Sequence, residues 1–181
     1  MATTATPIST PAVGAPPSAK EQFLNAYEKE HATTIRVLRA FPPDKVDLQP
    51  HPRCKTAREL AWIFTLERGL GTMVFANAFA SGGPVGGMPP APASWDEVIA
   101  AYEKAHKDFG DIVRATPDDE LMQQVKFFTA PKTLGDVTRL ELAWFLLCDE
   151  IHHRGQFSVY LRMADGKVPS IYGPSGDEPW M

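Results

Sequence analysis

The stretch with the most chemistry-bearing side chains is "DEIHHRGQFSVY", which runs from Asp149 to Tyr160. It places acids, two histidines, an arginine and a glutamine between apolar runs. Asp149 and His153 are four residues apart and share one face of a helix, whereas His152 is rotated by about 100 degrees. A carboxylate oxygen and an imidazole nitrogen that reach one point can bind a divalent metal ion, which then needs a further ligand from another helix.

The same spacing is also typical of an ion pair on a solvated helix face. Apolar residues flank the polar part of this stretch, residues 149–156: Leu142, Phe145, Leu146, Cys148, Phe157, Val159, Tyr160 and Leu161. They leave little room for a wholly exposed face. A buried carboxylate without a partner is costly, so the setting favours a lined site and leaves the solvated ion pair as the alternative.

Cap and breaker signals define the helices that must position these residues. The first helix is expected to follow Ser18 and to end before Pro42, because proline interrupts helical hydrogen bonding. Thr56 and Glu59 have the spacing of a capping box, which opens a second helix expected to run to about Ala80.

The third helix is expected over residues 94–115, where a serine and a glutamate again have capping-box spacing. The last helical pattern begins at Thr133, with a break near Gly135, and is expected to be continuous over residues 137–164. No segment alternates strongly enough to predict a strand. Four long amphipathic helices predict an all-α four-helix bundle, a fold that builds metal and ligand sites between facing helices.

The bundle is expected to form one domain over residues 18–181. Residues 1–17 are rich in Pro, Thr and Ala and predict a flexible, disordered tail that lacks the pattern of a secretory signal. The segment after the last helix, "KVPSIYGPSGDEPW", contains several turn residues and predicts an irregular arm that folds back over the bundle.

Composition narrows the classes of function and location. The formal net charge is −4, with no basic run, which argues against nucleic acid as a partner. No segment is long and apolar enough to predict a membrane span. Cys54 and Cys148 are too few for a disulfide framework and favour a reducing, cytoplasmic location, with Cys148 expected in the core.

Two longer segments carry a family resemblance. "HHRGQFSVYLRMADGKVPSIYGPS" resembles the end of the DinB-like, or YfiT-like, superfamily of DNA-damage-inducible proteins, in which "HRGQ" closes the last bundle helix. "TARELAWIFTLERGL" resembles that family's second helix. The order and lengths of the four helices also agree, so the resemblance covers most of the chain from about Ser18 onward.

The resemblance implies a metal site of three histidines, one on the second helix and two on the last. By position these fall on or near Ile63, on Asp149 and on His153, so one histidine is kept and a carboxylate replaces another. Glu67 lies one turn after Ile63 and could supply the missing ligand, or it could pair with Arg68, Arg154 or the N-cap region. A site of Glu67, Asp149 and His153 would be rich in oxygen and suits manganese, iron or magnesium without excluding zinc or nickel.

The resemblance also implies candidate functions. One is a metal-dependent thiol S-transferase or hydrolase acting on a small molecule, with Arg154 or Gln156 orienting the substrate. The alternative is a non-catalytic, stress-related binding protein that has lost the three-histidine site, and a purely structural dimer is a further possibility. A homodimer is expected from the resemblance and from aromatic residues near helix surfaces and in the arm, notably Trp95, Trp144 and Trp180.

Overall fold

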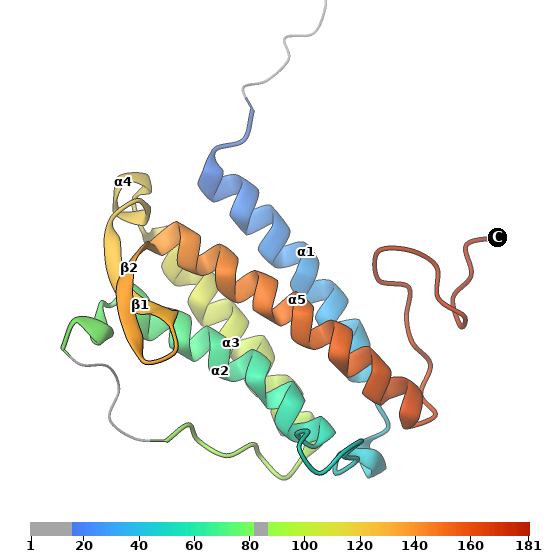
Figure 1. Ribbon diagram of the computed structural model, residues 1–181. Helices are drawn as coiled ribbons and strands as arrows, with labels where there is room; N and C mark the ends of the chain where they lie inside the picture. The colour runs from blue at the N-terminus through green and yellow to red at the C-terminus, as the bar shows by residue number, and fades with distance from the viewer. Residues whose placement is uncertain (1–15, 82–86) are drawn as a thin grey trace, which may run out of the picture.

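The computed structural model describes residues 16–81 and 87–181, which form a four-helix bundle (Figure 1). The bundle helices are α1 (Ala19–Arg39), α2 (Ala57–Phe75), α3 (Trp95–Ala115) and α5 (Arg139–Met163). Both α1 and α2 pack against α3 and α5, so α1 and α2 occupy opposite corners. In this part of the chain, no helix is long and apolar enough to cross a membrane. The expected all-α bundle is confirmed.

Side-chain caps set where the bundle helices begin. Reciprocal capping boxes open α1 at Ser18, where the helix start was expected, and α2 at Thr56, where the box itself was expected. At the start of α3, Ser94 accepts from the backbone N–H of Glu97, which is one half of the box expected there. The end of α2 differs, because the helix stops at Phe75 and not near Ala80. Asn77 adopts a φ of 55°, a left-handed conformation that asparagine tolerates and that terminates a helix. The chain then continues as the short 3-10 helix η2 (Ala78–Ser81).

A β-hairpin stands where the last helix was expected to begin. Strand β1 (Gln124–Ala130) pairs antiparallel with β2 (Thr133–Thr138), so the expectations of a helical start at residue 133 and of no strand were wrong. Thr138 and Glu141 form a capping box, and the helix therefore begins at Arg139. The residues before this cap remain extended and satisfy their backbone groups by pairing.

Shorter elements join the helices. The 3-10 helix η1 (Pro43–Lys45) follows α1, and α4 (Asp118–Leu121) links α3 to the hairpin. The chain after α5 is an irregular arm without helix or strand that returns along α1 (Figure 1). Glu178 of the arm pairs with Arg36 of α1 at 2.8 Å. The expected arm is therefore present, whereas the tail expected over residues 1–17 lies outside the described residues apart from residues 16 and 17.

A layer of polar side chains divides the interior into two apolar cores. One core surrounds Phe64 and Phe157, and the other surrounds Phe23 and Phe109. The buried polar and charged side chains between them are Glu30, Thr34, Glu67, Arg68, His106, Glu150 and Arg154. The polar stretch of the last helix therefore lies at mid-height in the bundle, between the two cores.

The outer face of α5 is more exposed than its apolar residues suggest. Cys148 is exposed, so its expected place in the core is wrong. Phe145 is 54% exposed and Val159 is 58% exposed, because both lie on the side of α5 that faces away from the bundle. Trp95, expected near the surface, is buried.

Candidate metal centre

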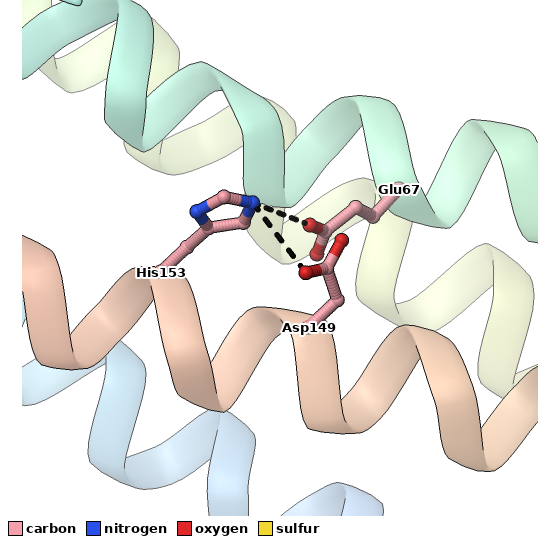
Figure 2. A group of neighbouring side chains, drawn as sticks. All are labelled: Glu67, Asp149 and His153. Atoms are coloured by element: carbon pink, nitrogen blue, oxygen red, sulfur yellow. Dashed lines mark ion pairs between the residues drawn. The ribbon is translucent and has the colours of Figure 1, made fainter. Parts of the chain in front are cut away.

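Glu67 on α2 meets Asp149 and His153 on α5 across the interface of the two helices (Figure 2). Nε2 of His153 is 3.6 Å from Oε1 of Glu67 and 3.7 Å from Oδ1 of Asp149. One ligand atom from each residue lies within 4.8 Å of the others. The structure thus brings together the three residues that the sequence grouped as ligands, which we call the triad.

Glu67 is the most constrained member of the triad. It is 5% exposed, yet neither carboxylate oxygen accepts a hydrogen bond from any described residue. Burial, followed by the negative charge of Asp149, raises the pKa of Glu67 to about 9. An ionised carboxylate at this position needs a cation close by, because buried charge is costly without a partner.

A second contact orients the imidazole of His153. Nδ1 of His153 lies 3.3 Å from Oε1 of Gln156, one turn further along α5. With the proton on Nδ1 donated to this amide, the lone pair of Nε2 faces the two carboxylates, the arrangement typical of a metal-binding histidine. Gln156 also contacts Nε2 of His152 through its amide nitrogen at 2.9 Å, so His152 lies beside the triad without joining it.

The residue after each triad member turns into the bundle. Arg68 forms a fully buried ion pair with Glu150, which ties α2 to α5 at the level of the triad. Glu150 also accepts hydrogen bonds from Thr34 at 2.7 Å and from Tyr102 at 2.8 Å. Arg68 further stacks its guanidinium over the ring of Tyr27, 4.6 Å from the centroid. Its partner is therefore Glu150, and the alternative pairing of Arg68 with the Glu67 carboxylate is not formed.

Arg154 faces α1 and not the triad. It is 1% exposed and pairs with Glu30 at 2.6 Å. The same guanidinium donates to Thr34 at 3.2 Å and to the hydroxyl of Tyr172 on the arm at 2.8 Å. Of the two residues expected to orient a substrate, Gln156 therefore lies beside the triad, and Arg154 is enclosed in the core.

The donor set and spacing of the triad fit a divalent metal ion. Ligand bonds of about 2.0–2.2 Å place neighbouring ligand atoms of a tetrahedral site roughly 3.4 Å apart, close to the two distances from His153. Two carboxylates and one imidazole suit manganese, iron, zinc or nickel. Three protein ligands leave at least one position for water or substrate. The Asp149 side chain is 38% exposed, so the site is open to solvent.

Two cavities of about 440 Å³ each flank the triad. The first includes Glu67 and Asp149 in its lining, and the second includes His153 and Gln156. Ile63 lines both cavities and is half-buried between them. This residue stands on or near the position where the family resemblance implies a histidine. Its aliphatic side chain supplies no ligand, and it forms an apolar wall beside the triad.

The chain matches the sequence profile of the DinB superfamily over residues 26–157, which include α2, α3 and the whole triad. The chain belongs to the DinB superfamily. It is 26% identical over 159 residues to the uncharacterised protein YrdA of Bacillus subtilis strain 168, covering 87% of this chain and 90% of that protein. The DinB membership expected from the two motifs is confirmed.

Solved DinB-like structures share the fold. A DinB-like protein from Bacillus cereus ATCC 10987 superposes with a TM-score of 0.67 at 21% identity, covering 84% of this chain and 97% of that one. A DinB-like protein, YjoA, from Bacillus subtilis gives a TM-score of 0.62 at 17% identity, covering 82% and 96%. At these identities the likeness establishes the DinB fold alone.

The buried ion-pair layer was not foreseen from the sequence. The signal was present as adjacent charged residues inside apolar helices, "ER" at Glu67 and "DE" at Asp149. On a helix, neighbouring residues point about 100 degrees apart, so such a pair sends one charge inward and leaves the other at the edge. The contact between Gln156 and His153 was equally readable from its three-residue spacing.

Proposed function

We propose that this DinB-family chain binds a divalent metal ion through Glu67, Asp149 and His153. The observation that carries the proposal is the buried Glu67 carboxylate, which has no hydrogen-bond donor among the described residues and lies 3.6 Å from an imidazole nitrogen. Zinc, nickel, manganese and iron are all compatible with the ligands. Either metal-dependent catalysis or non-catalytic binding can use such a centre.

The first candidate activity is that of a metal-dependent thiol S-transferase or hydrolase acting on a small molecule. A bound divalent ion supplies a Lewis acid that stabilises a thiolate or a hydroxide at neutral pH. Gln156 holds the His153 ring and lies at the second cavity, where it also meets the polar part of a substrate. Arg154 does not contact a substrate in this scheme, because its guanidinium is buried and engaged by Glu30.

The second candidate is a non-catalytic, stress-related binding protein built on the same bundle. Ile63 favours it, because an aliphatic residue stands on or near the position that carries a histidine in the family pattern. In that case the two cavities hold a ligand without turning it over. A protein that binds a metal ion without any reaction on thiols or hydrolysable compounds would support this candidate.

Metal analysis of protein purified without a chelator or a metal-affinity tag tests the proposal. After reconstitution with zinc, nickel, manganese or iron in turn, we expect stoichiometric uptake of at least one. His153→Ala should abolish uptake, whereas His152→Ala is the matched control and should retain it, because His152 lies off the triad. Glu67→Gln should weaken binding markedly. No uptake of any of the four ions by the wild-type chain would refute the metal site.

We also propose that the chain acts as a cytoplasmic homodimer. The exposed apolar side chains of α5, Phe145 and Val159, offer a surface suited to a second copy. Light scattering at micromolar concentration should give twice the monomer mass. A monomer mass would exclude this assembly without affecting the metal site.

A further inference from the structure

The cavity that contains Glu67 and Asp149 has one long apolar wall on α2. Trp62, Leu66 and Leu70 follow one another at intervals of four residues, so they share a single helix face. All three are half-buried, and Trp62 and Leu70 also pack against the edges of the two apolar cores. This wall leads directly to the carboxylates of the triad, which lie in the same cavity.

The opposite wall is a segment tied to the same helix. It consists of residues 88–91, which include two consecutive prolines. The indole nitrogen of Trp62 donates to the carbonyl oxygen of Pro89 at 2.8 Å. One turn earlier, Arg58 donates to the carbonyl oxygen of Ala93 at 3.2 Å. These two side chains hold the segment against α2, and the prolines restrict its backbone, so both walls of the cavity are fixed.

Four of the residues that line the cavity carry charged groups: Lys55, Glu59, Glu67 and Asp149. The Glu59 carboxylate accepts from the backbone N–H of Thr56 in the capping box. The rest of the lining is mainly apolar. The cavity should therefore favour ligands with apolar surface over sugars and other highly hydroxylated compounds.

We propose that this cavity, the α2 groove, binds the apolar body of a small aliphatic or aromatic compound whose anionic head reaches the triad. The proposal rests on the metal site described under the proposed function. Two carboxylates alone would repel an anion, whereas a divalent ion held by Glu67, Asp149 and His153 would neutralise them and offer an anion an open coordination position. The volume of about 440 Å³ is that of a small-molecule site.

A series of straight-chain hydroxamates from two to eight carbons tests the groove. Each compound carries the same metal-binding head, so only the length of the apolar body changes. On the full-length, zinc-loaded chain, calorimetry should show affinity rising about fourfold for each added methylene, the equivalent of ~0.8 kcal/mol, until the groove is full. Metal-free protein should bind none of them, and n-alkylamines should not replace them.

Leu66→Gln is expected to abolish most of the dependence on chain length while leaving binding of the two-carbon compound nearly unchanged. Leu70→Gln provides a second variant should Leu66→Gln fail to fold by circular dichroism. Phe145→Gln, on the exposed face of α5, is the matched control and should keep the full dependence. Val159→Gln changes the lining of the second cavity and not that of the groove, so it should also keep the dependence on chain length.

The outcomes separate the groove from the metal site. Binding of the two-carbon compound without any gain from longer chains would overturn the groove and leave the metal site intact. If the increase in affinity with chain length were lost in Val159→Gln but kept in Leu66→Gln, the apolar body would lie in the second cavity and the proposal would be overturned. If alkylamines bound to the metal-free chain, the head group of the ligand would be cationic and not anionic, which would also overturn the proposal. A chain that takes up none of zinc, nickel, manganese and iron refutes the proposed function first, and the groove proposal falls with it.

Discussion

Two sets of charged side chains lie back to back at mid-height in the bundle. Each triad member has an inward neighbour one position later: Arg68, Glu150 and Arg154 follow Glu67, Asp149 and His153. The inward set, completed by Glu30, contains two arginines and two glutamates that pair with one another. The triad contains two acids and no arginine or lysine. The inward charges are therefore paired within the chain, whereas Glu67 and Asp149 have no arginine or lysine partner among the described residues.

A single helix can carry both the side chains that stabilise the bundle and those that form the triad. Because consecutive residues point about 100 degrees apart, a single turn of α5 presents Glu150 to the core and Asp149 to the edge. The ion pair of Arg68 with Glu150 fixes α2 against α5 within one residue of Glu67 and Asp149. The inward layer of ion pairs thus holds the outward side chains of the triad near one another.

The largest expected effect comes from breaking the inward layer. Arg68→Met should lower the free energy of unfolding by about 3–5 kcal/mol, because it leaves the buried Glu150 without its partner. Urea denaturation measures the change. Arg39→Met is the matched control, since its pair with Glu103 is exposed, and it should cost less than about 1 kcal/mol. Equal losses in the two variants would mean that the inward pair is no more important than a surface pair.

Removing a charged group of the triad is expected to raise the free energy of unfolding, the opposite of the effect in the inward layer. The folded-state pKa of Glu67 is raised to about 9, so in metal-free protein the folded state keeps a proton that the unfolded state releases above about pH 4.5. Stability from this group should therefore fall as pH rises from about 5 to 9. Glu67→Met removes that loss and should be more stable than the wild type, by about 2–3 kcal/mol near pH 8.5.

The measurement for Glu67→Met is the difference in unfolding free energy between variant and wild type, in chelator, across this pH range. Burial lowers the pKa of His31 to about 4 and that of His106 to about 3, which gives an opposite slope below about pH 6.5. Both chains carry these histidines, so their contribution cancels in the difference. A difference that does not change with pH would show that Glu67 is ionised and satisfied in the metal-free chain.

The smallest effect should come from the contact that joins the inward layer to the arm. Tyr172→Phe removes the hydroxyl that donates to Glu30 at 2.8 Å and accepts from Arg154 at 2.8 Å. We expect a loss of about 0.5–1.5 kcal/mol in thermal or urea unfolding, because Glu30 and Arg154 still pair with each other. Metal content should remain that of the wild type. A loss of metal in Tyr172→Phe would show that the arm helps to position the triad.

Local signals in the sequence determined most of the helices and the shared helix face of Asp149 and His153. The caps at Ser18 and Thr56 fixed two helix starts, because a side chain that satisfies free N–H groups is encoded within four residues. The spacing of Asp149 and His153 placed both on one face of α5 for the same local reason. The capping box at Thr138 could have corrected the start of the last helix, since it carries the same signal.

Tertiary structure alone decided which charges became partners. Arg68, Glu150 and Glu67 are similar in sequence context, but the packing of α2 against α5 pairs the first two and leaves Glu67 facing Asp149. The hairpin likewise depends on two strands that form only when both are extended together, and the exposure of Cys148 depends on which face of α5 has no neighbour. Helix starts and the face that a residue occupies depend on covalent geometry and on contacts within a few residues, so they can be read from the sequence. Ion-pair partners, strand pairing and exposure depend on residues far apart along the chain that meet only in the folded bundle.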